Sequence, residues 1–316
     1  MKIFVTPTSF MKPQNEKARI ILEDFADEVI YNPYGRPLVS KEIVDLAKGC
    51  AGYIAGLDYI DKYVLDSLPE LKVISRYGAG VDRVDLDAAK VNKIVVTNTP
   101  GTNATAVCEL AAGLMMSLAR SIPKLDAKIR KGEWPRNNGT ELKGKKLSIL
   151  GLGAIGKKLA LRAKAFEMTV SAYDPYIDKC FAIENDIIIC SFDEAISNAD
   201  FISLHMPLNE QTRHCIDTRA IDKMKTGTMI INTARGGLIN EDDVYKAMIE
   251  GKIGGLALDA YEAEPVKKTP LMELDNVIFT PHTGAHTNEA IKAMGMMAVE
   301  NMIAVLNNKE CVNKVV

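Results

Sequence analysis

The chain has 316 residues, 47% hydrophobic and 25% charged, which are ordinary values for a folded protein of roughly two domains. Lys plus Arg total 39 against 41 Asp plus Glu, giving a net charge of -2. This balance argues against a nucleic-acid partner, which requires a concentrated basic face, but is compatible with a small anionic ligand.

The sequence also argues against a membrane segment, a signal peptide and a metal framework. No apolar run approaches the roughly 18 residues of a membrane span, and the first ten residues lack the apolar core of a signal peptide. The six cysteines form no CxxC pair, so we expect reduced thiols and no metal site. A cytoplasmic protein is expected.

Short apolar runs alternate with amphipathic runs over the first hundred residues. This alternation predicts a parallel sheet with helices on both faces. Strands are predicted at Lys2–Pro7, Val29–Tyr31, Gly52–Ala55, Leu71–Ser75 and Ile94–Thr97. Helices are predicted at Gln14–Phe25, Lys41–Ala47, Ile60–Leu68 and Leu86–Val91, followed by a long buried helix at Ala104–Ser121.

A second alternating series begins near Gly144, so the fold class is α/β with two doubly wound parallel sheets. The last helix, predicted at Asn288–Asn307, has no strand after it and is expected to pack on the first unit, which would make that unit discontinuous. After the strand Lys146–Leu150 and the helix Ala154–Phe166, strands are predicted at Thr169–Ala172, Ile187–Cys190, Phe201–Leu204, Met229–Asn232, Gly255–Leu258 and Val277–Thr280.

A GxGxxG motif, GLGAIG at residues 151–156, lies between a predicted strand and a predicted helix. In this context Gly151 makes a tight turn, Gly153 lets a pyrophosphate approach the backbone, and Gly156 allows close helix–strand packing. The next strand ends at Asp174, whose carboxylate can bind both ribose hydroxyls and would repel a 2′-phosphate. The motif therefore predicts a dinucleotide site that prefers NAD to NADP.

Three polar motifs follow later strands and so lie at carboxyl ends of parallel strands, where ligands bind in open α/β sheets. They are NTARGG (232–237), LDAYEAEP (258–265) and TPHTGAHT (280–287). Removing hydride from an alcohol requires a base for the hydroxyl proton, and histidine suits this role. Of the four histidines, His282 lies in one of these motifs; His205 is expected to line the cofactor loop, and His214 and His286 are expected to be bystanders.

These motifs, together with HMPLNEQT (205–212) and SRYGAGVDRVDLDAA (75–89), resemble those of the D-isomer-specific 2-hydroxyacid dehydrogenases over nearly the whole chain, most of all the short phosphoglycerate dehydrogenases. The resemblance implies a flavodoxin-like substrate-binding domain at 1–99 plus 288–316 and a Rossmann NAD-binding domain at 100–287. It also implies a homodimer joined through the NAD-binding domains.

The resemblance assigns Arg235, Glu264 and His282 as the catalytic residues. Arg235 would hold the substrate carboxylate and polarise the keto oxygen, and His282, backed by Glu264, would exchange the proton. NAD would be bound by Gly151, Gly153, Ala154, Ile155, Gly156, Asp174, Pro207, Thr212, Thr233, Ala234, Arg235, Asp259, His282 and Gly284. The substrate would be bound by Arg76, Tyr77, Gly78, Ala79, Gly80, Asn103, Arg136 and Arg235.

The substrate implied is D-3-phosphoglycerate, with 3-phosphohydroxypyruvate as the keto acid, because Arg76 and Arg136 match positions that bind phosphate in some relatives. Against this, Tyr53–Ile60 holds no cation where some of those enzymes carry an arginine. The alternatives are another D-2-hydroxyacid dehydrogenase, acting on lactate, glyoxylate or hydroxypyruvate, or an NAD-sensing corepressor that binds partner peptides. Formate dehydrogenase is disfavoured, because it carries glutamine where this chain has Glu264.

Overall fold

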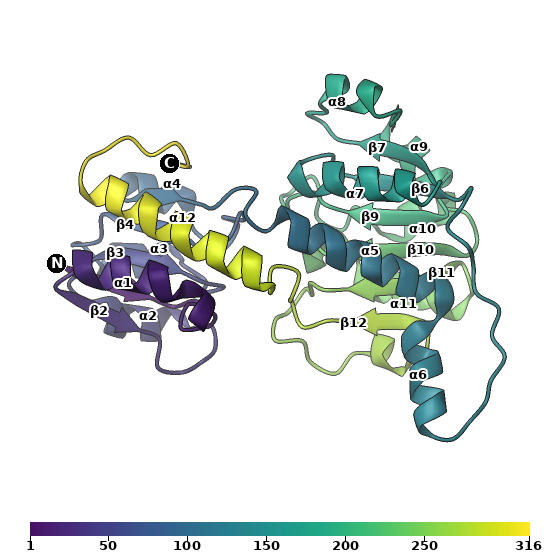
Figure 1. The fold of residues 1–316 in the computed structure, drawn as a ribbon, viewed down its shortest axis with the longest axis horizontal. Coiled ribbons are helices and arrows are strands. Elements are labelled where there is room, and N and C mark those ends of the chain that lie inside the picture. The colour runs from purple at the N-terminus through teal and green to yellow at the C-terminus, as the bar shows by residue number, and fades with distance from the viewer. The chain divides into compact units, whose positions relative to one another are not determined.

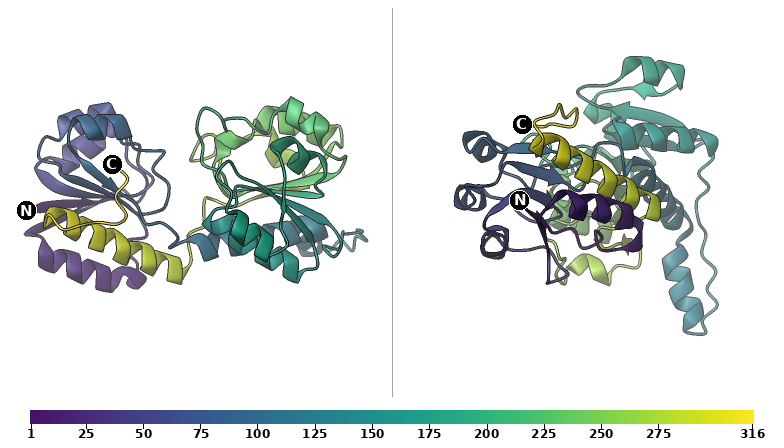
Figure 2. Two further views of the ribbon diagram at one scale, coloured as in Figure 1. Left: turned by 90° about the horizontal axis from the view of Figure 1, so that it is seen from above. Right: turned by 60° about the vertical axis from the view of Figure 1, so that its left-hand side comes forward.

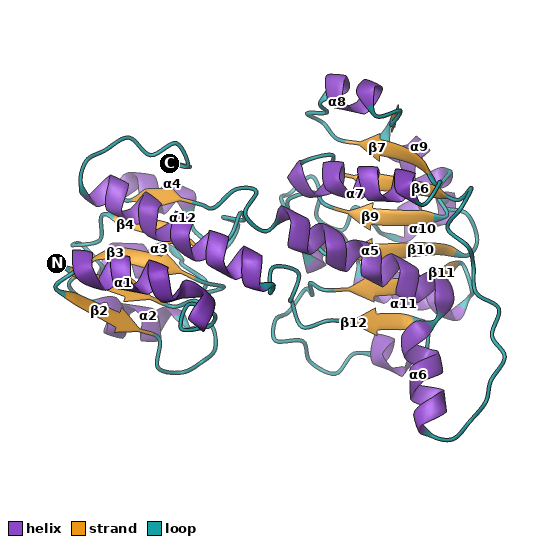
Figure 3. Ribbon diagram, viewed as in Figure 1, coloured by secondary structure: helices purple, strands orange, loops and turns teal.

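The computed structural model describes residues 1–316, and the chain divides into two compact units. The first unit contains residues 1–103 and 285–316, and the second contains residues 104–284. Figure 1 shows the chain coloured by residue number, and Figure 3 shows that both units consist of strands covered by helices. The predicted α/β class with two parallel sheets is confirmed.

The sheet of the first unit has five parallel strands in the order β2-β1-β3-β4-β5, which is the flavodoxin-like order. Its strands are β1 Lys2–Val5, β2 Glu28–Tyr31, β3 Cys50–Ala55, β4 Val73–Arg76 and β5 Val95–Thr97. Its helices are α1 Glu16–Phe25, α2 Ser40–Ala47, α3 Lys62–Ser67, α4 Leu86–Val91 and α12 Asn288–Leu306.

Helix α12 belongs to the first unit although it is the last helix of the chain. It lies beside α1 in both views of Figure 2 and packs on β3 and β4. Its buried residues Ala298, Val299 and Met302 join Ile3, Val5 and Leu22 in one apolar core. Burial of this apolar face explains why the chain returns to the first sheet after completing the second.

The sheet of the second unit has seven parallel strands in the order β12-β11-β10-β9-β6-β7-β8. Its first six strands in the chain follow the order of a Rossmann fold, with β12 added at one edge. The strands are β6 Lys146–Leu150, β7 Thr169–Tyr173, β8 Ile188–Ile189, β9 Phe201–Leu204, β10 Thr228–Asn232, β11 Ile253–Leu258 and β12 Val277–Phe279. The helices are α5 Ala104–Arg120, α6 Ile122–Arg130, α7 Ala154–Ala165, α8 Lys179–Glu184, α9 Phe192–Ser197, α10 Thr218–Lys223 and α11 Glu241–Ile249.

The order of this sheet reverses between β6 and β9, which are neighbours although they are not consecutive. Loops leaving the carboxyl ends of such a pair diverge and leave space for a ligand. The long helix α5 covers one face and contacts α7, β10 and β11, with Cys108, Ala111 and Met115 buried beneath it.

Taken one at a time, none of the helices has the length and apolar character of a membrane span. Helices α5 and α6, which meet at a bend of 63°, satisfy that test together by length and composition.

Candidate active site

The three predicted catalytic residues all belong to the second unit and follow three neighbouring strands. Arg235 follows β10, Glu264 follows β11, and His282 follows β12. These strands are paired in parallel, so their carboxyl ends lie at one edge of the sheet.

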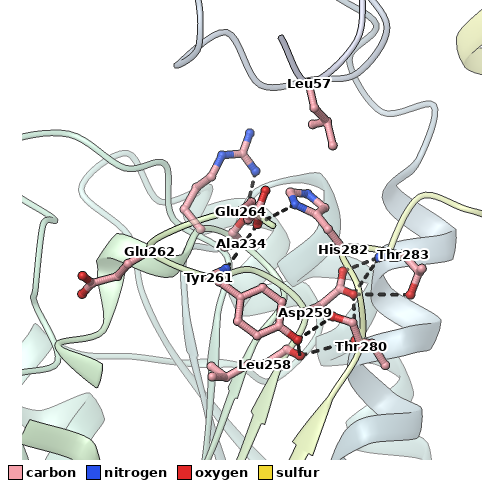
Figure 4. A network of polar contacts seen from close by, with 12 residues as sticks. Leu57, Ala234, Leu258, Asp259, Tyr261, Glu262, Glu264, Thr280, His282 and Thr283 are labelled. Atoms are coloured by element: carbon pink, nitrogen blue, oxygen red, sulfur yellow. Dashed lines mark hydrogen bonds and ion pairs between the residues drawn. The ribbon is translucent and has the colours of Figure 1, made fainter. Parts of the chain in front are cut away.

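Glu264 and His282 form a hydrogen-bonded pair. His282 Nδ1 lies 2.8 Å from Glu264 Oε1, and the side chains are 25% and 14% exposed, respectively. The same Glu264 oxygen accepts a hydrogen bond of 3.2 Å from the backbone N–H of Tyr261. Figure 4 shows the imidazole and the carboxylate pointing toward one another. With Nδ1 engaged by the carboxylate, Nε2 is the ring nitrogen that can exchange a proton with a ligand.

Arg235 lies in a loop that packs tightly against the segment leading to Glu264. The Arg235 carbonyl accepts a bond of 2.8 Å from Asn232 Nδ2, and its Nη1 donates to the Ala234 carbonyl at 2.8 Å. A Cβ on Gly236 would lie 1.8 Å from the carbonyl carbon of Tyr261, so only glycine permits this close approach. The backbones of the arginine loop and of the segment leading to Glu264 are therefore in close contact at Gly236.

Asp259 holds the segment that carries His282. Its side chain is 1% exposed and accepts hydrogen bonds from Thr280 Oγ1 at 2.7 Å, Thr283 N–H at 2.7 Å and Gly284 N–H at 2.8 Å. Figure 4 shows these bonds beside His282, whose φ of 51° is a backbone conformation that side chains with a Cβ rarely adopt. A non-glycine residue in this conformation, held by neighbouring bonds, is typical of functional sites.

The Tyr261 hydroxyl forms further hydrogen bonds within this network. Its hydroxyl donates to the Thr280 carbonyl at 2.7 Å and lies 3.2 Å from the Leu258 carbonyl. Burial raises the pKa of Tyr261 to about 12, so the hydroxyl keeps its proton and remains a donor. The ends of β11 and β12 are thereby linked beneath the Glu264–His282 pair.

The glycine motif lies between β6 and α7, at the point where the order of the sheet reverses. Gly151 has φ of 102°, and a Cβ there would lie 2.7 Å from the His205 carbonyl carbon. A Cβ on Gly156 would lie 2.2 Å from the Gly151 oxygen, whereas one on Gly153 would meet nothing within 4 Å. Gly153 is thus the glycine that a ligand can approach, and Ala154 and Ile155 follow it as the first residues of α7.

Asp174 lies immediately after β7 and turns toward the glycine loop. One carboxylate oxygen accepts the Leu152 N–H and the other the Tyr176 N–H, both at 2.8 Å. Each oxygen has a further lone pair, so the carboxylate can still accept hydrogen bonds from a ribose. Thr233, after β10, has a buried hydroxyl oxygen without a hydrogen-bond partner, which a bound dinucleotide can supply. The residues present therefore fit a dinucleotide.

The other predicted cofactor residues lie on loops at carboxyl ends of strands in the same sheet. Thr212 Oγ1 donates to the Pro207 carbonyl at 2.7 Å and closes the loop after β9. Ala234 follows β10, and Gly284 follows β12, where a Cβ would lie 2.9 Å from Asp259 Oδ2. His205, at the end of β9, has a buried Nδ1 without a partner, and burial lowers the pKa of this histidine to about 4.

The predicted substrate residues lie in both units. Residues 76–80 end β4 and form the loop after it, and Asn103 directly precedes α5. Arg136 is exposed in the segment between α6 and β6 of the second unit. Tyr77 has a structural role, because its hydroxyl donates to the Ile291 carbonyl of α12 at 2.9 Å. Arg76 is 4% exposed.

Several residues of the site were not singled out from the sequence. Asn232 and Gly236 hold the arginine loop, whereas Thr280, Thr283 and Tyr261 hold the pair. All five lie inside the motifs that resemble the family, so their position was indicated but their roles were not. His214, expected to be a bystander, lies 2.8 Å from Glu262 and donates its backbone N–H to the Gly237 carbonyl.

The chain is similar in sequence to a family of known proteins. Residues 112–284 match the NAD binding domain of the D-isomer specific 2-hydroxyacid dehydrogenases. The chain is 41% identical to D-3-phosphoglycerate dehydrogenase of Methanocaldococcus jannaschii over 319 aligned positions, covering 100% of this chain and 59% of that protein. It is 42% identical to hydroxypyruvate reductase of Thermotoga maritima over 246 positions, covering 76% of this chain and 79% of that protein.

Solved structures give the same result for the fold. The apo-structure of D-lactate dehydrogenase from Escherichia coli matches with a TM-score of 0.85 and 30% identity, covering 100% of both chains. The chain spans 59% of the Methanocaldococcus relative, and 47% of the D-3-phosphoglycerate dehydrogenase of Archaeoglobus fulgidus, to which it is 40% identical over 77% of its own length. The matched NAD binding domain contains Arg235, Glu264 and His282. The chain therefore belongs to the family of D-isomer specific 2-hydroxyacid dehydrogenases.

Proposed function

We propose that the protein is an NAD-dependent enzyme that interconverts a D-2-hydroxy acid and its 2-keto acid. The observation that carries this proposal is the Glu264–His282 pair, with 2.8 Å between Oε1 and Nδ1, on strands that neighbour the one preceding Arg235. A carboxylate-backed imidazole beside a guanidinium is what proton exchange with a keto acid requires.

In the direction of reduction, His282 Nε2 donates a proton to the keto oxygen as that oxygen gains negative charge. The carbonyl carbon would receive the hydride that NADH supplies when bound. Glu264 stabilises the protonated imidazole and keeps the ring oriented through Nδ1. Arg235 presents a fixed guanidinium fork that can pair with the substrate carboxylate and polarise the keto oxygen. In the direction of oxidation, His282 takes the hydroxyl proton.

The substrate-binding domain is proposed at residues 1–99 plus 288–316, within the first unit, and the NAD-binding domain at residues 100–287, which include the second unit. The loop of Gly78, Ala79 and Gly80 would bind the substrate carboxylate through backbone N–H groups, with Asn103 helping to orient it. Two relatives at 40–41% identity are named D-3-phosphoglycerate dehydrogenase, so D-3-phosphoglycerate is the leading substrate. Arg76 and Arg136 are the proposed cationic residues for its phosphate.

A screen of keto acids tests this proposal. Purified protein is incubated with NADH and, separately, with 3-phosphohydroxypyruvate, hydroxypyruvate, glyoxylate, pyruvate and 2-oxoglutarate, and NADH consumption is followed. The highest kcat/KM is expected for 3-phosphohydroxypyruvate. A preference for hydroxypyruvate or glyoxylate would favour the second candidate, which the relatives named hydroxypyruvate reductase and glyoxylate reductase support. Tight NADH binding without turnover of any keto acid would contradict the enzyme proposal and favour an NAD sensor.

The position of Asp174 supports NAD as the preferred cofactor. A 2′-phosphate near this carboxylate would be repelled, whereas ribose hydroxyls can donate to it. Asp174→Ala is therefore expected to reduce kcat/KM for NADH. The ratio of kcat/KM for NADH to kcat/KM for NADPH should decrease as a result. An unchanged ratio would contradict this role, and the melting temperature of the variant controls for loss of the Leu152 contact.

We also propose that the protein is a homodimer joined through the segment at 102–144. Exposed apolar side chains support this surface: Ile122, Ile129 and Trp134 are 51%, 50% and 78% exposed. Light scattering should give a dimer for the wild type and a monomer for the Ile129→Ser/Trp134→Ser double variant. Ile183→Ser, which is 72% exposed on α8, is the control. A monomeric wild type would contradict the proposal.

A further inference from the structure

The loop formed by Gly78, Ala79 and Gly80 has all three of its carbonyl oxygens bound within the first unit. The Gly78 carbonyl accepts Thr99 N–H at 3.1 Å, the Ala79 carbonyl accepts Asn98 Nδ2 at 2.7 Å, and the Gly80 carbonyl accepts Arg76 Nε at 3.3 Å. These three donors come from the end of β4 and from residues that follow β5.

The backbone N–H groups of the same loop are differently placed. Gly78 N–H donates to Thr99 Oγ1 at 2.9 Å, but the N–H groups of Ala79 and Gly80 donate to no protein atom. Ala79 is exposed and Gly80 is partly exposed, so their hydrogen-bonding capacity is available to a ligand. The loop therefore offers donors and has its acceptors occupied, which is the property of an anion-binding loop.

The buried Arg76 side chain bonds backbone carbonyl oxygens at two places in the first unit. Its side chain is 4% exposed, and Nη1 donates to the Ala55 carbonyl at 3.2 Å and to the Gly56 carbonyl. It thus joins the carboxyl end of β3 to the loop after β4. A guanidinium has only donors, so it satisfies carbonyl oxygens at both places at once.

We propose that Arg76 and Asn98 are positioning residues that orient the loop so that the N–H groups of Ala79 and Gly80 receive the carboxylate of a 2-keto acid. This inference rests on the proposed function and changes one part of it, because Arg76 then acts on the carboxylate through the loop and does not contact a substrate phosphate. If the Gly80 or Ala79 carbonyl were released, its oxygen could turn toward the anion and repel it.

The two roles of Arg76 predict different substrate dependence. A phosphate ligand affects only phosphorylated substrates, whereas a positioning residue affects every keto acid, since all share the carboxylate. Arg76→Lys keeps the charge but loses the fork that reaches three carbonyls, and Asn98→Ala removes only the donor to Ala79. Each variant is assayed with hydroxypyruvate and with 3-phosphohydroxypyruvate. Asn92→Ala, which removes an amide bonded to Asp66 and Ala88 in the same unit, is the matched control.

We expect KM to rise by the same factor, about tenfold, for both substrates in both variants, because one weakened hydrogen bond to a charged group has about this effect. The kcat should change less than KM, since the carboxylate is bound equally in the ground state and the transition state. The affinity of both variants for NADH should equal that of the wild type. The KM values of the Asn92→Ala variant should also equal those of the wild type. A purely structural role would instead lower the melting temperature without changing KM.

An increase in KM confined to 3-phosphohydroxypyruvate in Arg76→Lys would overturn the inference and identify Arg76 as a phosphate ligand. Unchanged KM values in Asn98→Ala would also overturn it, and this variant serves alone if Arg76→Lys does not fold. Binding of oxamate, which resembles a 2-keto acid but is not reduced, is measured by calorimetry in parallel. If the wild type binds oxamate but reduces no keto acid, the proposed function fails, while weaker oxamate binding by Asn98→Ala would still support the positioning role.

Discussion

Replacing Glu264 with glutamine tests how the carboxylate contributes to proton transfer by His282. The two side chains are joined at 2.8 Å, and glutamine has nearly the same shape as glutamate. The backbone N–H of Tyr261 donates to the same Oε1 atom at 3.2 Å, and only an oxygen can accept it. The amide oxygen of glutamine is therefore expected to stay where the carboxylate oxygen lies and to keep the proton on Nδ1.

The size of the effect follows from this geometry. If the ring orientation and tautomer persist, the contact with His282 loses the difference between a charged and a neutral hydrogen bond, about 1–2 kcal/mol. This corresponds to a decrease in kcat of about 5- to 30-fold. Turning the amide so that its NH2 group faced the imidazole would force the wrong tautomer, and the corresponding change in a serine protease triad costs about 10⁴ in kcat.

The assay is steady-state reduction of the best keto acid from the substrate screen, with both NADH and the keto acid saturating, so that the rate gives kcat. Glu262→Gln is the matched control, because Glu262 is a 42% exposed carboxylate in the same segment that pairs with His214. An unchanged kcat in Glu264→Gln would refute the charge-stabilisation role. A loss of more than about a thousandfold would instead refute the idea that Tyr261 fixes the orientation of the amide.

Two further predictions concern Gly236 in the arginine loop and His205 at the end of β9. Gly236→Ala should lower both stability and kcat, because a Cβ 1.8 Å from the Tyr261 carbonyl carbon must push the arginine loop away. The free energy of unfolding, measured with denaturant, is expected to fall by about 1–3 kcal/mol. A wild-type value would contradict this prediction. His205 has a pKa lowered by burial from 6.5 to about 4, so the unfolded chain binds its proton first as pH falls. The free energy of unfolding should therefore decrease between these two pH values, by up to about 1.4 kcal/mol per pH unit, and His205→Asn should remove this part of the slope. Equal slopes in the two proteins would show that the ring is not buried in solution.

The sequence predicted the strands well because strands of a doubly wound sheet are buried on both faces and read as short apolar runs. Phe201–Leu204, for example, was predicted with the bounds that the structure has. The helices α6, α8, α9, α10 and α11 were not predicted. Length alone does not explain this, because α4 has six residues, as α8, α9 and α10 do, and was predicted with its observed bounds, Leu86–Val91. The long helix predicted to end at Ser121 ends at Arg120, since Ser121 takes a φ of 51°, which its residue type does not reveal.

The candidate site could be predicted as a set of residues but not as a set of contacts. Arg235 and His282 each lie three positions after the end of a strand, so their place at the sheet edge followed from chain order alone. The partners of Asp259 lie on the loop after the neighbouring strand, at residues 280–284, and nothing local in the sequence indicates that pairing. For Arg76, the resemblance implied a phosphate ligand. The burial of this side chain and its bonds to backbone carbonyls depend on how the loops after β3 and β4 fold, which the sequence does not indicate.

The pair and the arginine loop are held by residues that need not touch a substrate. Gly236 lets the arginine loop meet Tyr261, Tyr261 fixes Glu264 through its N–H, and Asp259 fixes the segment of His282. The Gly236–Tyr261 approach and the Asp259 bonds each join the loop after one strand to the loop after the next, whereas the Tyr261–Glu264 bond lies within the loop after β11. The spacing of the parallel strands therefore sets the spacing of the reacting groups. A change at any link should therefore reduce catalysis by moving groups that are themselves unaltered, because proton transfer is sensitive to displacements well below the size of an atom. Because the site depends on contacts between neighbouring loops, the motifs predicted which residues take part, whereas the contacts that position them are defined only in the folded sheet.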